Sequence, residues 1–196
     1  PTLLDNPDYT SVVNERHFQR INGYVDEARE RGVEVVEINP ANEDFRQQSA
    51  HKIAPTFLID PPEDSAVMQD EIFGPVMPIK SYDTLDETVD YVNSHDRPLG
   101  LYYFGTDQQE TDQVLGNTTS GGVTLNDVVM HVAQEDLPFG GVGPSGMGSY
   151  HGEDGFRTFS HAKAVFKQAT FNPAEKLGLR PPYGEKLIGL LKAQMK

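Results

Sequence analysis

The chain has 196 residues, which suits one domain with a sizeable core, and 37% hydrophobic residues with 10 Phe and 8 Tyr exclude a disordered chain. A formal net charge of −14 would repel nucleic acid and anionic membranes, so neither is expected as the main partner. Because there is no cysteine, no disulfide, zinc-thiolate site or cysteine nucleophile can form within these residues.

The sequence carries no targeting or membrane signal. No apolar run approaches the roughly 18 residues that a membrane span requires, and the first ten residues do not resemble a signal peptide. A cytoplasmic location is therefore the default expectation. The chain starts with Pro1 and not with Met, so we expect residues upstream that are missing from this sequence.

The first 38 residues predict a helix followed by a strand. Asn6 and Pro7 are typical of a helix N-cap and first position, and Gly32 can close the helix. One apolar stripe runs along it, formed by Phe18, Ile21, Val25 and Ala28. The β-branched residues of "VEVVEI" (33–38) then favour a strand.

The middle of the chain alternates strands with helices. Extended segments are predicted at 54–60, 76–82, 99–105 and 121–127, and helices at 84–95 and 106–117. Thr84 and Glu87 have the spacing of a capping box. This alternation predicts an α/β fold with parallel pairing, in which ligands bind near the carboxyl ends of strands.

The last third of the chain is less regular. Residues 127–155 predict a long ordered loop, a feature that is usually functional in a compact domain. The alternating "FRTFSHAKAVFKQ" (156–168) predicts a strand, and "EKLIGLLKAQMK" (185–196) a short amphipathic helix that packs on the body of the protein.

A G-x-G-x-x-G spacing occurs at residues 141–146, but its context does not fit a dinucleotide-binding turn. Such a turn follows a buried strand and opens a helix, whereas this one follows polar "QEDLPF" and precedes the aperiodic "MGSYHGEDG". Pro144 also removes a backbone N–H that a phosphate would need. We therefore interpret the stretch as a tight loop whose glycines allow close approach to other parts of the chain.

Three segments in order carry a resemblance to the C-terminal half of the aldehyde dehydrogenase superfamily. They are "MQDEIFGPVMPI" (68–79), "SGGVTLND" (120–127) and "LPFGGVGPSGMGSYHGEDGFRTFSH" (137–161). The last of them and "RPPYG" (180–184) are most similar to the class-3 and coniferyl aldehyde dehydrogenase branch, and the helix near the start also resembles the family.

The resemblance implies an enzyme that oxidises a small-molecule aldehyde to its acid with NAD or NADP, and the resemblance to the coniferyl aldehyde dehydrogenase branch implies an aromatic aldehyde. In the family a cysteine thiolate attacks the aldehyde, hydride passes to the cofactor, and a water activated by glutamate hydrolyses the thioester. The nucleophilic cysteine, the base and the cofactor domain are missing from these residues. We therefore expect the chain to begin downstream of the cysteine and to be inactive alone.

The resemblance also implies the architecture. It predicts a three-layer, open, mostly parallel sheet in residues 1–160, the C-terminal portion of the catalytic domain. Residues 161–196 would add an oligomerisation strand and a tail, which implies a homo-oligomer, either a dimer or a tetramer. An ordinary edge strand is the alternative interpretation of "SHAKAVFKQ" (160–168).

Individual site residues follow from the same motifs. Glu71 matches the glutamate that binds the nicotinamide ribose, and Phe73 the aromatic residue beside it; the alternatives are a solvated acid and a core anchor. Phe139 matches an aromatic residue that lines the aldehyde tunnel. Asn126 ends a strand and is expected to hold loop backbone.

The two central histidines and the overall function leave alternatives. His131 and His151 have no partners at metal-ligand spacing, so hydrogen-bonded structural roles are expected and no metal is predicted. A free-standing assembly or regulatory module with this fold would also explain the missing cysteine. A third hypothesis is a related acyl-phosphate reductase, although "EIFGP" and "LPFGG" favour the oxidative branch.

Overall fold

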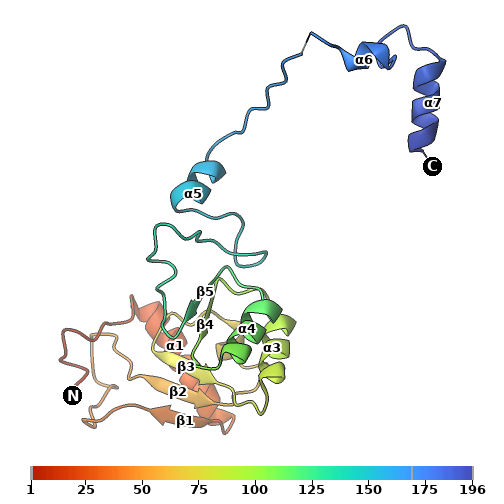
Figure 1. Cartoon of the computed structure of the whole chain (residues 1–196). Helices are drawn as coiled ribbons and strands as arrows, with labels where there is room; N and C mark the ends of the chain where they lie inside the picture. The colour runs from red at the N-terminus through yellow and green to blue at the C-terminus, as the bar shows by residue number, and fades with distance from the viewer. Residues whose placement is uncertain (1, 169, 196) are drawn as a thin grey trace. The chain divides into compact units, whose positions relative to one another are not determined.

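The computed structural model describes residues 2–168 and 170–195, and the chain divides into two units, Pro1–Ser94 and His95–Lys196 (Figure 1). The described residues form a three-stranded sheet and a two-stranded sheet with helices around them, which confirms the α/β class. Two of the three strand pairs are parallel. The single open sheet in three layers stays a prediction.

Helix α1 (Glu15–Glu30) begins later than the sequence signals predicted. Its N-cap is Asn14, whose side chain accepts from the backbone N–H of His17 at 3.0 Å. Asn6 instead closes a local turn by accepting from the N–H of Asp8 at 2.9 Å, and no helix follows it. The predicted start at Asn6–Pro7 was therefore wrong, whereas the apolar stripe was predicted correctly.

The core of the first unit lies between α1 and its sheet. Strand β1 (Glu34–Glu37) pairs antiparallel with β2 (Thr56–Ile59), which pairs parallel with β3 (Val76–Ile79). Helix α1 covers one face of this sheet (Figure 1). Ile21 and Leu58 are fully buried at the centre of the contact, each worth about 2–3 kcal/mol of apolar burial.

Two further helices complete the first unit. Helix α2 (Ala66–Gln69) is one turn long and precedes the loop that leads into β3. Helix α3 (Leu85–Ser94) starts with the predicted pair, because the N–H of Glu87 donates to the Thr84 hydroxyl at 3.4 Å. The Glu87 carboxylate accepts from the N–H of Asp83 at 3.1 Å, one residue earlier than an ideal capping box.

The second unit contains a parallel strand pair. Strands β4 (Gly100–Tyr103) and β5 (Gly122–Leu125) pair directly and are connected by α4 (Gln108–Asn117). Asp107 caps α4 by accepting from the N–H groups of Gln109 and Glu110. Helix α4 ends at Asn117, the last residue of the range predicted for it.

After β5 the chain is irregular as far as α5 (Gly152–Thr158), as predicted for most of this stretch. The strand predicted over 156–168 is wrong at its start, because Arg157 pairs with Glu153 one helical turn earlier at 2.5 Å. Residues 161–168 run as an exposed segment without assigned strand or helix (Figure 1). A strand there needs a partner, so the oligomerisation strand is not confirmed.

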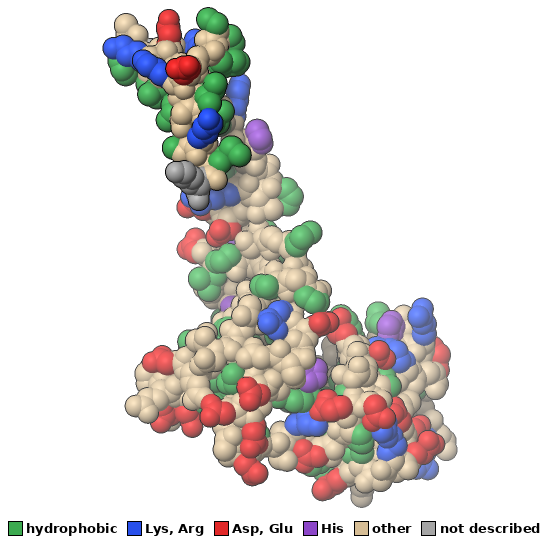
Figure 2. All heavy atoms as spheres, turned by 90° about the vertical axis from the view of Figure 1, so that its right-hand side faces the viewer, with side chains coloured by type: hydrophobic (Ala, Val, Ile, Leu, Met, Phe, Trp, Pro, Cys, Tyr) green, Lys and Arg blue, Asp and Glu red, His purple; other side chains and the backbone are tan. Residues whose placement is uncertain are grey.

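The C-terminal residues form the short α6 (Pro173–Lys176) and α7 (Glu185–Gln194), the latter close to the prediction. None of the helices in the described ranges is long and apolar enough to span a membrane. Figure 2 shows Asp and Glu side chains spread over the face that it presents, in keeping with the net charge of −14.

Candidate active site

In the first unit, the loop of Glu71 and Phe73 joins α2 to β3 and is held by α1. The Arg20 guanidinium donates to the backbone carbonyl oxygens of Glu71 at 3.2 Å and Ile72 at 2.7 Å. It also lies 5.3 Å from the centre of the Tyr24 ring. Because an arginine side chain presents several donors in a rigid fork, one residue of α1 fixes two successive carbonyls of the loop.

Tyr24 fastens the beginning of the same loop. Its hydroxyl donates to the Asp70 carboxylate at 2.8 Å, and its ring is buried against the core. Burial raises the pKa of Tyr24, and the hydrogen bond to Asp70 acts in the same direction. The phenol therefore stays protonated and remains a donor to Asp70.

The tip of the loop turns the Phe73 side chain outward. Phe73 has a φ of +50° and is 73% exposed, so it is not the core anchor of the alternative interpretation. A Cβ on the next residue, Gly74, would lie 2.5 Å from the Ile21 Cδ1 atom. The loop thus packs its backbone onto the core and presents the aromatic ring to the surface.

Glu71 is exposed as well. Among the residues that the structure describes, its carboxylate has no hydrogen-bond or ion-pair partner. Phe73 and Gly74 border an open hollow of about 340 Å³, whose other wall is formed by residues 9–13. A carboxylate can accept from hydroxyl groups and an exposed ring can stack on a flat group, so the loop offers the acceptor and the surface that a nucleoside requires.

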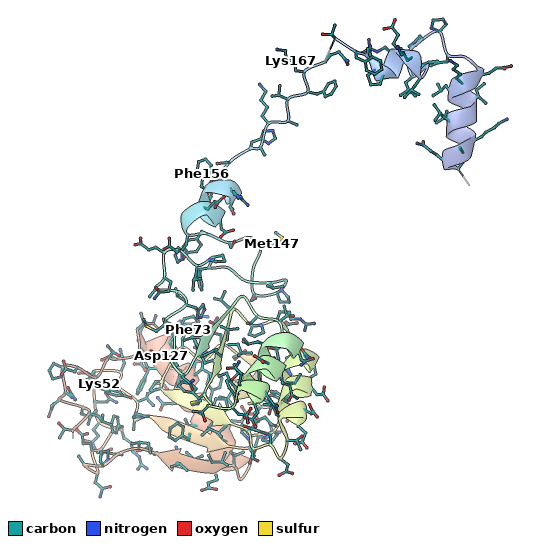
Figure 3. The ribbon with its side chains drawn as sticks, viewed as in Figure 1. Lys52, Phe73, Asp127, Met147, Phe156 and Lys167 are labelled. Atoms are coloured by element: carbon teal, nitrogen blue, oxygen red, sulfur yellow. The ribbon has the colours of Figure 1, made fainter. Side chains whose placement is uncertain are left out.

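Lys52 binds the residues that precede the opposite wall of this hollow in the chain. Lys52 is only 8% exposed, and its ammonium donates to three backbone carbonyls, those of Leu3, Leu4 and Asn6, at 3.1, 2.8 and 2.7 Å. All three of its N–H donors are thereby used. Figure 3 labels Lys52 among the loops beside the three-stranded sheet.

Other groups around Lys52 extend the same attachment. The Glu43 carboxylate accepts from the N–H groups of Leu3 and Leu4 at 2.5 and 3.0 Å. Further along the chain, the N–H of Val12 donates to the His51 carbonyl at 2.9 Å. The Tyr9 hydroxyl donates to the Ile53 carbonyl at 2.5 Å. Residues 43–53 therefore hold the N-terminal segment that lines the hollow.

In the second unit, Asn126 directly follows β5 and lies in the left-handed region at a φ of +55°. Its side-chain oxygen accepts from the N–H of Gly105 at 2.9 Å, and its amide donates to the Gly105 carbonyl at 3.0 Å. Asn126 therefore bonds the backbone after β4 in the way a neighbouring strand would. The scaffold role expected for it agrees with this geometry.

The glycine-rich stretch is a compact loop. A Cβ on Gly140 would lie 2.0 Å from the Gly148 carbonyl oxygen, and one on Gly141 would lie 2.1 Å from that of Ser145. Gly143 has a φ of +62°, and no helix starts before Gly152. The rejection of a dinucleotide-binding turn is thus in accord with the structure, since no helix N-terminus lies at this spacing.

Phe139 lies at the start of this loop, half-buried in a group of rings. It exchanges two backbone hydrogen bonds of 2.9 Å with Tyr150, and the two rings meet edge to face at 5.6 Å. Together with Tyr150 and Phe159 it borders an open hollow of about 270 Å³. Met147, on the rim of the same hollow, is 96% exposed and projects from the loop (Figure 3).

Both histidines accept or donate structural hydrogen bonds, as expected. The His131 Nδ1 atom lies 2.7 Å from the Thr124 hydroxyl, and the His151 Nδ1 atom lies 3.2 Å from the Leu137 carbonyl oxygen. Within the described ranges, no group of three or more His, Asp or Glu residues is arranged to hold a metal ion.

The structure therefore brings Glu71 and Phe73 together in the first unit, and Phe139 with the two histidines in the second. Sequence reasoning missed Arg20, Tyr24 and Lys52. A lysine inside the mostly apolar "HKIAPTF" was a signal for Lys52, since a buried cation requires partners. Arg20 left no such signal, because an arginine on a helix is usually solvated.

Comparisons with known proteins agree on one family. Residues 2–165 match the aldehyde dehydrogenase family. The chain is 64% identical over its whole length to a probable coniferyl aldehyde dehydrogenase of Caulobacter vibrioides, and 52% identical over 97% of its length to a coniferyl aldehyde dehydrogenase of a Pseudomonas species. It is 41% identical over 92% of its length to the dimeric NADP-preferring aldehyde dehydrogenase of Rattus norvegicus. The chain spans 40%, 40% and 38% of these relatives.

Solved structures show the same relationship. The substrate-bound state of AldH from Staphylococcus aureus superposes with a TM-score of 0.75 at 37% identity, covering the whole chain and 40% of its own. A variant of aldehyde dehydrogenase C from Pseudomonas syringae with NAD+ and octanal gives 0.64 at 28% identity, over 76% of this chain and 30% of its own. The resemblance inferred from the sequence motifs is thereby confirmed.

Proposed function

The chain belongs to the aldehyde dehydrogenase family, and we propose that it is the C-terminal part of an enzyme that oxidises an aldehyde to its carboxylic acid with NAD or NADP. The observation that carries the proposal is the 64% identity over the whole chain to a probable coniferyl aldehyde dehydrogenase. The chain covers 40% of that relative, so the activity belongs to a longer protein. A cytoplasmic location is part of the same proposal.

Glu71 and Phe73 are proposed to hold the nicotinamide end of the cofactor. The exposed Glu71 carboxylate, which has no partner within residues 2–168 and 170–195, would accept from ribose hydroxyls, and the outward Phe73 ring would lie against the sugar and the nicotinamide. When bound, the cofactor accepts hydride from the substrate. The contribution of this chain is to present the two side chains on a loop that Arg20 and Tyr24 hold in place.

Phe139 is proposed to line the aldehyde site. Its half-buried ring lies among other rings, a surface suited to the flat apolar body of an aromatic aldehyde. Two relatives are named coniferyl aldehyde dehydrogenases, one of them as a probable one, and we propose an aldehyde of this class. Backbone N–H groups and asparagine donors of the whole site would stabilise the oxyanion.

The remaining catalytic groups lie outside this sequence in the proposal. These 196 residues contain no cysteine, so the thiolate nucleophile would come from another part of the whole protein, and we expect the chain alone to be inactive. In the whole protein, residues 1–160 would complete a three-layer, open, mostly parallel sheet. Residues 161–168 would form a strand in a homo-oligomer, either a dimer, as the name of the rat relative states for that enzyme, or a tetramer.

The experiment is a steady-state assay of the whole protein. Coniferyl aldehyde, benzaldehyde and acetaldehyde would be supplied with NAD or NADP, and the absorbance of the reduced nicotinamide followed. We expect the whole protein to have its highest kcat/KM with coniferyl aldehyde. The 196-residue chain alone should show no activity with any of the three aldehydes. If no aldehyde reduces either cofactor, a non-catalytic assembly module becomes the better hypothesis. A requirement for inorganic phosphate in the reaction would indicate an acyl-phosphate reductase.

A further inference from the structure

The imidazole of His131 lies on a pair of glycines in the second unit. His131 is only 7% exposed. A Cβ on Gly122 would lie 2.5 Å from its Cδ2 atom and 2.9 Å from its Nε2 atom, and one on Gly100 would lie 3.5 Å from its Cε1 atom. Gly100 and Gly122 are direct partners in the β4–β5 pair. The two missing side chains therefore leave the space that the ring occupies.

Thr124, two residues after Gly122, fixes the rotation of this ring. The backbone N–H of His131 donates to the Thr124 hydroxyl oxygen at 3.1 Å, and the same hydroxyl is hydrogen-bonded to the Nδ1 atom of the ring at 2.7 Å. Backbone and ring of His131 are thus both bound to one hydroxyl group. Nε2 is buried without a hydrogen-bond partner among the described residues, and it faces the glycine pair. The ring thus has no polar atom directed at a ligand.

Two aromatic rings also lie near the imidazole. Its centre lies 6.1 Å from that of Phe139 and 6.0 Å from that of Tyr102. Phe139 in turn meets Tyr150 edge to face at 5.6 Å and is bonded to it through the backbone. Phe139 therefore has one ring neighbour fixed by the strand pair and another fixed by the loop.

We propose that His131 is a positioning residue that sets the orientation of Phe139 and thereby the preference for aromatic aldehydes. The proposal rests on the proposed function, because it takes Phe139 as part of the aldehyde site. His131 acts through packing and is not a catalytic residue. Its expected effect is on the KM for a bulky aldehyde, because Phe139 is the proposed aldehyde contact.

The test uses variants of the whole protein. Thr124→Val removes the hydroxyl that orients the imidazole, Thr124→Ser restores it, and Gly122→Ala displaces the ring without altering His131. Gly116→Ala in α4 is the matched control, because a Cβ there would meet no atom within 4 Å. We expect the KM for coniferyl aldehyde to rise about three- to tenfold in Thr124→Val and Gly122→Ala, the range of one aromatic contact. In these two variants the KM for cofactor and the KM for acetaldehyde should stay within about twofold of the parent values. In Thr124→Ser and Gly116→Ala, all three KM values should stay within about twofold of the parent values.

A second measurement does not depend on catalysis. Fluorophenylalanine placed at position 139 gives a 19F NMR signal that reports the environment of the ring. We expect this signal to shift or broaden in Thr124→Val and Gly122→Ala but not in Gly116→Ala. A parental signal and a parental KM in both variants would overturn the positioning role. A whole protein without aldehyde oxidation would overturn the proposed function instead, while the 19F signal would still decide whether His131 orients Phe139.

Discussion

Asn126 and Gly105 exchange two hydrogen bonds, one from the Gly105 N–H to the Asn126 side-chain oxygen at 2.9 Å and one from the Asn126 amide to the Gly105 carbonyl at 3.0 Å. The pair closes the chain segments that follow β4 and β5. Both bonds require the amide group, because a carboxylate has no donor and an aliphatic side chain has neither donor nor acceptor.

Replacement of Asn126 should separate these bonds from backbone strain. Asn126→Ala loses both bonds and places alanine at a φ of +55°, so we expect a loss of about 1–3 kcal/mol in the free energy of unfolding of the whole protein. Asn126→Gly loses the bonds but tolerates the backbone, and its loss should be smaller. Urea titration of both variants measures the difference. Equal stability of parent and Asn126→Ala would show that the two bonds contribute nothing.

Glu71→Gln tests the proposed cofactor contact. The neutral amide loses charge-assisted acceptance from the ribose hydroxyls, each worth about 1.5–3 kcal/mol at most. We expect the KM for the nicotinamide cofactor to rise about tenfold or more, with little change in the KM for aldehyde. Glu30→Gln removes another exposed acid, at the end of α1, and serves as the control. Parental kinetics of Glu71→Gln at limiting cofactor would identify Glu71 as a solvated acid.

Two glycines in the first unit predict opposite effects of alanine. In Gly74→Ala the new Cβ would lie 2.5 Å from the buried Ile21 side chain, so the loop or the core must shift at about 1–3 kcal/mol. In Gly23→Ala, within α1, the Cβ meets no atom within 4 Å, and the helix should gain about 0.5–1 kcal/mol. Thermal unfolding of the whole protein should give a lower Tm for the first variant and a higher one for the second. Two equal Tm values would contradict the packing of Gly74 on α1.

Lys52→Met should release the N-terminal segment. The methionine fills a similar volume but leaves the carbonyls of Leu3, Leu4 and Asn6 without their donor, at a cost of about 2–4 kcal/mol. Lys80→Met is the control, because Lys80 forms an exposed ion pair with Glu63 and such pairs are worth about 0–1 kcal/mol. Hydrogen exchange of Leu4 and Val12 should accelerate in Lys52→Met alone. Unchanged exchange there would mean that Glu43 suffices to hold the segment.

The loss of folding stability at acidic pH should depend on Asp60. The Ser81 N–H and hydroxyl, which donate to this carboxylate at 2.8 and 3.0 Å, hold the pKa of Asp60 below its usual range. A lowered folded-state pKa stabilises the fold above the ordinary value of about 4, and this stabilisation is lost as the pH falls through the folded value. In Asp60→Asn the unfolding midpoint should therefore fall less steeply on acidification than in the parent. Ser81→Ala keeps the N–H donor, so the pH dependence of its unfolding midpoint should lie between those of the parent and Asp60→Asn. The same pH dependence in all three proteins would show that Asp60 does not contribute.

Local patterns predicted the regular elements well where their causes lie within a few residues. The stripe of α1, the β-branched residues of β1 and the Thr84–Glu87 pair of α3 all act within about three helical turns. The start of α1 could not be predicted in this way. Residues 3–12 are held by Glu43, His51 and Lys52, which lie about forty residues later in the chain, and these contacts override the helix signal of Asn6 and Pro7.

The site was predicted through family motifs more than through chemistry. Glu71, Phe73 and Phe139 were chosen by resemblance, and the structure adds their supports: Arg20 and Tyr24 for the first two, and His131 with Tyr150 for Phe139. These supports act across the fold between residues distant in sequence, which a single sequence does not encode as a spacing. The strand expected at 161–168 depends on another strand for its hydrogen bonds, so its sequence alone could not specify it.

The exposed side chain and left-handed backbone conformation of Phe73 also affect how this protein responds to engineering. A phenylalanine at a φ of +50° costs about 1–2 kcal/mol that glycine or asparagine would avoid, and its exposed ring gains little from burial. Selection of variants for thermal stability alone would therefore favour replacement of Phe73. Because the Phe73 ring is the proposed cofactor contact, the selected variant would be more stable but would bind the cofactor less well. Stabilisation campaigns on this family member should hold position 73 fixed and recover stability in α1, for example at Gly23.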